Sequence, residues 1–101
     1  MVNYKILQLN KENRGYLFRP YEDVENDIDL NRYNMVYEGQ IDTLETKVDT
    51  IDILDHLYRR FNTIKPTDFK GHSLSVSDIV VIDGTYYYCD SFGWQELNLA
   101  R

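Results

Sequence analysis

Hydrophobic and polar residues alternate with two different periods along the chain, which predicts both strands and helices. Residues 4–9 alternate in part and residues 32–38 alternate strictly, as half-buried strands do. Residues 15–18 predict a further strand that would form an N-terminal hairpin with the first. We expect Gly39 to end the strand at 32–38, and Pro20 followed by acids to start a short helix at residue 21.

A helical period dominates the middle of the chain. Seven apolar residues recur there at spacings of three and four: Leu44, Val48, Ile51, Leu54, Leu57, Tyr58 and Phe61. Charged residues fall mainly on the opposite face: Glu45, Asp49, Asp52, Asp55 and Arg59. This pattern predicts an amphipathic helix, most firmly over residues 51–61, whose apolar stripe faces the core. Its start stays open, because Asp42 would cap a longer helix and Asp49 or Thr50 a shorter one.

The last third of the sequence predicts antiparallel strands. Residues 78–82 are rich in β-branched side chains, Asp83 and Gly84 form a two-residue hairpin turn, and residues 86–89 return. Residues 94–97 alternate and predict a third strand. The fold class is therefore α+β: a small, mostly antiparallel sheet packed against one main helix at about residues 51–61. At 101 residues, the chain (1–101) is expected to be a single domain.

Composition and charge narrow the function classes. No apolar run reaches the roughly 18 to 20 residues that a membrane helix needs, and Cys89 is the only cysteine, so we expect a cytoplasmic protein without a disulfide. Residues 22–55 carry eleven acids and two bases, a charge of −9, whereas the rest sums to +3. We expect a negative face that repels nucleic acid and attracts a basic protein surface. The alternative is a solvated face that only promotes solubility.

Residues 71–78 contain a histidine, three serines and an aspartate, so nucleophilic hydrolysis is one hypothesis. It would rest on His72, Ser73, Ser75 and Asp78. The alternative, which the absence of a G-x-S-x-G elbow favours, is that these side chains hydrogen-bond backbone groups at the entry to the hairpin. We expect no catalytic residue, and no metal or cofactor, because the two histidines and the cysteine make an incomplete zinc set.

Three successive tyrosines, at positions 86–88, raise the possibility of a platform for stacking bases. Residues 78–96 contain four acids and neither lysine nor arginine, which disfavours direct nucleic-acid binding. Alternation places Tyr87 on the opposite face from Tyr86 and Tyr88. An aromatic surface for protein contact and simple packing across the sheet remain the two interpretations.

Several segments resemble the YodL-like domain family. The family pattern FN, P-x-D-F-x-G-x-S-L-S-V-S-D-V-V and Y-Y-x-D-S-x-G-F is similar to residues 61–62, 66–81 and 87–94, and residues 33–39 resemble an upstream Y-x-x-V-Y-x-G element. Trp94 replaces the usual phenylalanine and Cys89 fills a variable position. The resemblance implies a small domain of bacterial mobile elements, and it carries over no catalytic residue.

These observations together predict a non-enzymatic binding protein. The resemblance to mobile-element domains implies an inhibitor of a host defence protein, for example a Cas nuclease, which the acids would engage partly by mimicking phosphates. A regulatory module that contacts host cell machinery is the alternative. The expected partner-binding residues are Glu45, Asp49, Asp52, Asp55, Tyr87 and Trp94.

Overall fold

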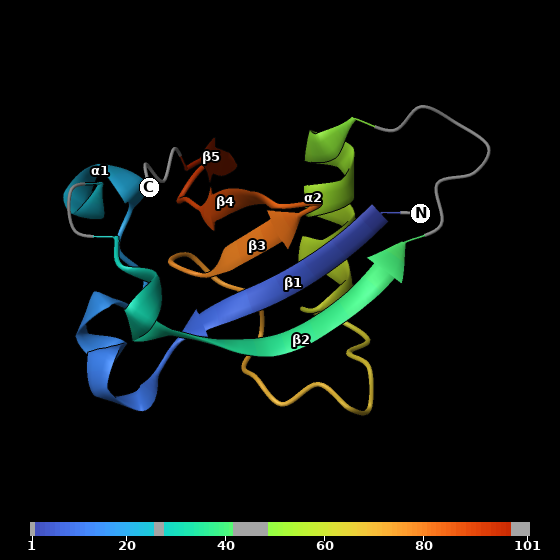
Figure 1. Cartoon of the computed structure of the whole chain (residues 1–101), viewed down its shortest axis with the longest axis horizontal. Coiled ribbons are helices and arrows are strands. Elements are labelled where there is room, and N and C mark those ends of the chain that lie inside the picture. The colour runs from blue at the N-terminus through green and yellow to red at the C-terminus, as the bar shows by residue number, and fades with distance from the viewer. Residues whose placement is uncertain (1, 26–27, 42–48, 98–101) are drawn as a thin grey trace.

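The computed structural model describes residues 2–25, 28–41 and 49–97. They form a five-stranded antiparallel sheet in the order β2-β1-β3-β4-β5, with the helix α2 on one face and three short helices at one end of the other (Figure 1). The elements are β1 (Val2–Leu9), η1 (Lys11–Tyr16), α1 (Tyr21–Val24), η2 (Leu30–Arg32), β2 (Tyr33–Ile41), α2 (Thr50–Arg60), β3 (Ile79–Ile82), β4 (Thr85–Cys89) and β5 (Trp94–Glu96). This arrangement confirms the α+β class with one main helix.

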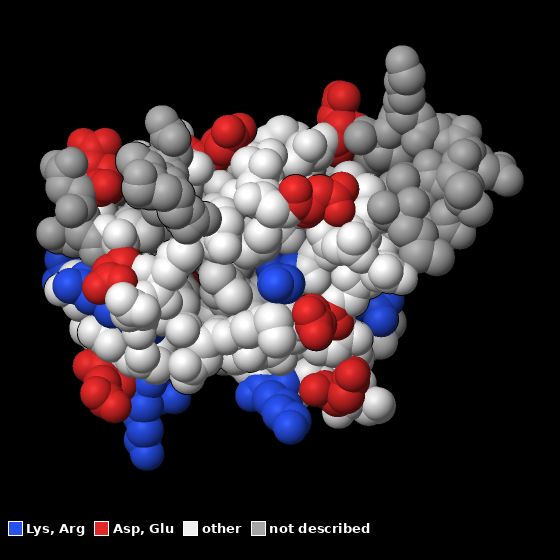
Figure 2. Space-filling view, viewed as in Figure 1, with Lys and Arg blue, Asp and Glu red and all other residues white. Residues whose placement is uncertain are grey.

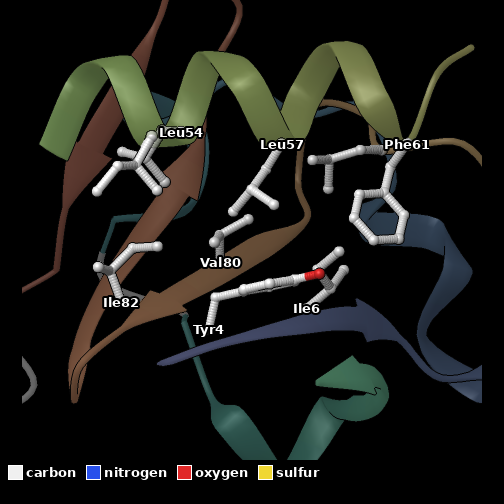
Figure 3. Close-up of a cluster of buried hydrophobic side chains, with 9 residues drawn as sticks. Tyr4, Ile6, Leu54, Leu57, Phe61, Val80 and Ile82 are labelled. Atoms are coloured by element: carbon white, nitrogen blue, oxygen red, sulfur yellow. The ribbon is translucent and has the colours of Figure 1, made fainter. Parts of the chain in front are cut away.

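Two cores, one on each face of the sheet, explain why β3 carries no polar residue. Figure 3 shows the core under α2, where Leu54, Leu57 and Phe61 pack on Tyr4, Ile6, Val80 and Ile82. The second core joins α1 to the opposite face through Val24, Ile79, Val81, Tyr88 and Leu97. Because both faces are covered, all four residues of β3 are buried.

The main helix begins and ends close to its predicted bounds, but its buried stripe is rotated. Ile53, Leu54 and Leu57 are buried, whereas Ile51 is 52% exposed and Tyr58 40% exposed. The prediction that Ile51 and Tyr58 face the core was therefore wrong, because these two residues, seven apart, lie on one flank of the helix rather than under it. Leu44, Val48 and the alternative start at Asp42 lie outside the described residues.

The C-terminal hairpin is confirmed. Asp83 and Gly84 have φ of 46° and 89°, as the two central residues of a type I′ turn require, and they join β3 to β4. The strand β5 pairs with β4 from Cys89–Trp94 to Tyr87–Glu96, as the alternation predicted.

The predicted N-terminal hairpin was wrong. Both edges of β1 are occupied, by β2 and β3, so residues 15–18 have no edge of β1 to pair with. Instead η1 begins after Asn10, whose carbonyl accepts from the amide of Asn13, and Phe18 has a φ of 64°. The short helix at Tyr21–Val24 is confirmed.

The strand β2 departs from strict alternation through a bulge. Ile6 pairs with Tyr37 and Leu7 with Met35, so Val36 is an extra residue and the side chains after it change faces. Tyr33 thus packs in the second core and Tyr37 in the first, which corrects the prediction that they share a side. Gly39 does not end the strand, which continues to Ile41 opposite Val2.

No helix in the described part of the chain is long and apolar enough to cross a membrane.

Two isoleucines on the same helix test which side of α2 faces the core. Ile53→Ala removes a buried side chain, so we expect it to lower the free energy of unfolding by about 2 to 5 kcal/mol. Ile51→Ala is the matched control, since the exposed side chain loses little and alanine favours the helix by a few tenths of a kcal/mol. Urea unfolding at equilibrium measures both, and equal losses would contradict this orientation of α2.

Candidate partner-binding surface

Three of the four predicted acids lie on or next to α2. Asp52 and Asp55 are exposed along the helix, and Asp49 is exposed at its N-cap position, where its side chain makes no capping hydrogen bond. Glu45 lies outside the described residues. The carboxylates of Asp52 and Asp55 are therefore open to solvent on a rigid element.

The predicted aromatic residues lie beside the same helix. Trp94 pairs with Cys89, two residues from Tyr87, so Trp94 and Tyr87 are on the α2 side of the sheet. The Trp94 ring meets the Tyr58 ring of α2 edge to face, with centroids 6.5 Å apart and an interplanar angle of 84°. Tyr87 is half-buried against the α2 core, so it supports this surface more than it offers contact.

We use the name α2–β5 surface for the surface that five residues of these two elements form: Ile51, Asp52, Asp55, Tyr58 and Trp94. It combines two exposed apolar side chains, a half-buried indole and two carboxylates. The sequence did not predict Ile51 and Tyr58 as surface residues, because their helical spacing placed them in the core-facing stripe. Glu96 adds a further exposed acid two residues from Trp94, on the same side of β5, and strand alternation is the signal that would have found it.

The described acids of residues 22–55 do not gather on one continuous face. Glu22 and Asp23 lie on α1, Glu38 on β2, and Asp52 and Asp55 on α2. The helices α1 and α2 cover opposite faces of the sheet and are separated along its length (Figure 1). Figure 2 shows lysine and arginine side chains between acids on the face in view. The described acids are therefore spread over several elements and both faces of the sheet.

The residues of the hydrolytic hypothesis surround a buried carboxylate. Asp78 is fully buried, and its Oδ2 accepts hydrogen bonds from Gln8 Nε2 at 3.0 Å and from the amide of Ser75 at 2.8 Å. Gln8 also donates to the carbonyl of His72 at 2.9 Å and accepts from its amide at 3.1 Å. The side chain of Gln8 thus joins β1 to the segment at residues 71–78.

Among the described residues, no serine hydroxyl of this segment forms a hydrogen bond with the His72 ring. The Ser75 hydroxyl donates to the carbonyl of Ser73, which also lies 2.8 Å from His72 Nδ1. The His72 Nε2 is 3.8 Å from Asp78 Oδ1, and the Ser77 hydroxyl is buried without a partner among the described residues. A nucleophile would need a hydrogen bond to its base. The contacts instead fit the structural interpretation, in which Asp78 and Ser75 bond to backbone groups.

Burial dominates the electrostatics of this region. It raises the pKa of Asp78 to about 7, against the lowering effect of the hydrogen bonds from Ser75 and Gln8. Burial also raises the pKa of the Cys89 thiol to about 12, and the neighbouring carboxylates of Asp78 and Asp90 add to this shift. Such a thiol stays protonated at neutral pH and is a poor nucleophile. Within the described ranges, no three acidic, histidine or cysteine side chains gather as a metal site would need.

Comparison with known proteins gives one family and no individual relative. The model of the YodL-like domain matches residues 3–99. No curated protein and no solved structure matches the chain.

The buried carboxylate predicts an unusual dependence of stability on pH. The pKa of Asp78 rises from its usual 3.8 to about 7, so between these values the folded protein holds a proton that the unfolded chain has released. The free energy of unfolding must therefore fall as the pH rises through this window, by on the order of 4 kcal/mol from this group.

Asp78→Asn isolates this effect, because the amide oxygen can still accept from Gln8 and Ser75. We expect the variant to be less stable than the wild type at pH 4, or equal to it, and to gain relative to it as the pH approaches 8. Urea unfolding across this range measures the difference, in which the contributions of other groups cancel. Asp83→Asn, at an exposed turn, serves as the control. A difference between wild type and Asp78→Asn that stays constant with pH would contradict the prediction.

Proposed function

The chain belongs to the YodL-like domain family, and from this premise we propose that it is a non-enzymatic binding protein that docks the α2–β5 surface on a basic surface of a host protein. The single observation that carries the proposal is the contact between Tyr58 and Trp94, with Ile51 exposed on the same flank of α2 about two turns away. Apolar side chains held at the surface by a helix and a strand are typical of the anchors that contribute most to protein association.

The charges around these anchors indicate the chemistry of the partner. Asp52, Asp55 and Glu96 are exposed within or beside the surface, in a chain whose net charge is −6. Acids at the rim of an apolar patch favour a partner rich in lysine and arginine, and they repel nucleic acid. Proteins that bind nucleic acid present such basic surfaces.

We propose further that the partner is a host defence nuclease, for example a Cas nuclease, and that the protein inhibits it from a mobile genetic element. The resemblance to mobile-element domains supports this assignment, and so does the pairing of carboxylates with an aromatic anchor. The carboxylates would occupy sites that otherwise hold phosphates, and Trp94 would contact an apolar part of the groove.

A regulatory module without inhibitor activity is the second candidate. The observation that favours it is the interleaving of basic residues with acids in Figure 2, since a broad mimic of nucleic acid would be more uniformly negative. Capture from a host lysate on the immobilised protein, followed by mass spectrometry, separates the two. A defence nuclease supports the inhibitor, whereas a protein of cell shape or replication supports the module.

Charge reversal on α2 tests the acidic part of the surface. The double variant Asp52→Lys and Asp55→Lys should weaken binding to the captured partner by about tenfold and flatten its dependence on salt, because two attractive charges become repulsive. Titration calorimetry at two salt concentrations measures both effects.

The matched control for charge is Glu12→Lys with Glu25→Lys. This pair makes the same change in net charge at exposed positions away from α2, on or next to η1 and α1. If the two double variants weakened binding equally, attraction would be a property of net charge and not of the α2–β5 surface.

Truncation of the aromatic pair tests the apolar part. Trp94→Ala should cost about 2 kcal/mol or more of binding free energy, and the more exposed Tyr58→Ala about 1 kcal/mol, because both remove anchors from the centre of the surface. Thermal unfolding confirms that each variant is folded, and Ile64→Ala, an exposed apolar residue beyond the C-terminus of α2, is the control. Wild-type affinity in both aromatic variants would refute docking through this surface.

A further inference from the structure

The other flank of α2 borders a small cleft of different chemistry. A cleft of about 250 Å³ lies between α2 and β2, lined by Tyr4, Tyr37, His56, Arg60 and the backbone at Gly39. His56 and Arg60 are four residues apart and so project from the same side of the helix. This acidic protein thus places two basic side chains together at one opening.

These basic side chains form no ion pair with an acid of the described residues. No described carboxylate lies within 4.0 Å of Arg60 or His56. The nearest electrostatic neighbours of the Tyr4 hydroxyl include Tyr37, Arg60 and Asp68, yet Asp68 does not reach the guanidinium. Arg60 therefore keeps its hydrogen-bond donors available for a ligand.

The tyrosines add neutral donors at the floor of the cleft. Tyr4 is only 6% exposed, and its hydroxyl has no hydrogen bond to the described residues. Gly39 leaves room for this hydroxyl, since a Cβ at that position would lie 2.8 Å from it. Burial raises the pKa of Tyr4, and the neighbouring Tyr37 raises it further, so the group remains a donor at neutral pH.

A carboxylate matches this donor set. Its planar pair of oxygens can take the forked donors of Arg60 on one side and a phenol hydroxyl on the other. The cleft is below the roughly 300 to 1,000 Å³ of sites for drug-sized ligands, so it suits one side chain better than a nucleotide.

The edge of the sheet beside the cleft indicates how such a side chain could arrive. The nine-residue strand β2 is at the end of the strand order, and no described strand pairs with its outer edge. It contains no proline or lysine, and Glu38 is its only charge. Exposed edges of this kind accept an additional strand, whose side chains alternate between the two faces.

We propose that the cleft binds the carboxylate of an acidic side chain on an extended segment of a partner protein, and that this segment pairs with the outer edge of β2, where no described strand pairs. The backbone of β2 supplies the hydrogen bonds, and Arg60, His56 and Tyr4 select the acid. This site is separate from the α2–β5 surface, which lies on the other flank of α2.

Three probes distinguish the sources of the anion: a blocked pentapeptide with the sequence Thr-Val-Glu-Val-Thr, the same peptide with glutamine at its centre, and inorganic phosphate. Each is titrated into the whole protein, and NMR follows the backbone amides of β2 and the imidazole of His56. The glutamate peptide should shift both groups of signals and bind about tenfold more tightly than the glutamine peptide.

Two neighbouring arginines provide the variants. Arg60→Gln should abolish the preference for glutamate, whereas Arg59→Gln, which removes the same charge from a residue outside the cleft, should keep it. Equal affinity for the two peptides, shifts that do not include β2, or no binding at all would overturn the proposal. So would phosphate that reproduces the His56 shift while neither peptide binds, since the cleft would then be a site for a free anion.

Discussion

The hydrogen bonds of the Gln8 side chain, one to Asp78 and two to the backbone of His72, are the interaction on which the rest of the architecture depends. The segment after α2 must cross the molecule before it enters β3, and it has no regular structure of its own over residues 71–78. Gln8, near the end of the interior strand β1, holds this segment through the backbone of His72 and the buried carboxylate of Asp78. Gly71 leaves room for this crossing, because a Cβ there would collide with Oε1 of Gln8 and displace the amide that makes these bonds.

The C-terminal end of the segment at residues 71–78 also forms hydrogen bonds with other strands of the sheet. Ser77 adopts a φ of 90°, a strained value for serine. The amide of Ser77 donates to the carbonyl of Cys89, and the carbonyl of Ser77 accepts from the Tyr33 hydroxyl. The carbonyl of Asp78 accepts from the amide of Cys89. A segment without secondary structure thus contacts β1, β2 and β4. The sequence pattern shared with the YodL-like domain covers this segment, and its glycine, serine and aspartate positions have structural roles here.

The elements that local sequence determines could be predicted, and those that depend on distant partners could not. The residue types Asp83 and Gly84 are by themselves enough to predict the turn, and the apolar stripe of α2 predicts a helix, so both elements were expected. The prediction of a hairpin with residues 15–18 was wrong because nothing in the local sequence indicates that β1 is an interior strand, with β2 and β3 on its two edges. For the candidate surface, alternation placed Tyr87 and Trp94, but the rotation of α2 that exposes Ile51 and Tyr58 is set by tertiary packing.

The packing of α2 also explains why one helix can present two different surfaces. Its core stripe, including Leu54 and Leu57, is fixed by the sheet below, and this leaves the two flanks at fixed orientations. One flank brings Tyr58 to Trp94 at β5, and the other brings Arg60 to β2, so opposite chemistries face opposite edges of the sheet. Because both flanks belong to the same eleven-residue helix, rotation of α2 about its axis would move both at once. The buried stripe is therefore the constraint that positions both candidate sites, although none of its residues lies on the α2–β5 surface.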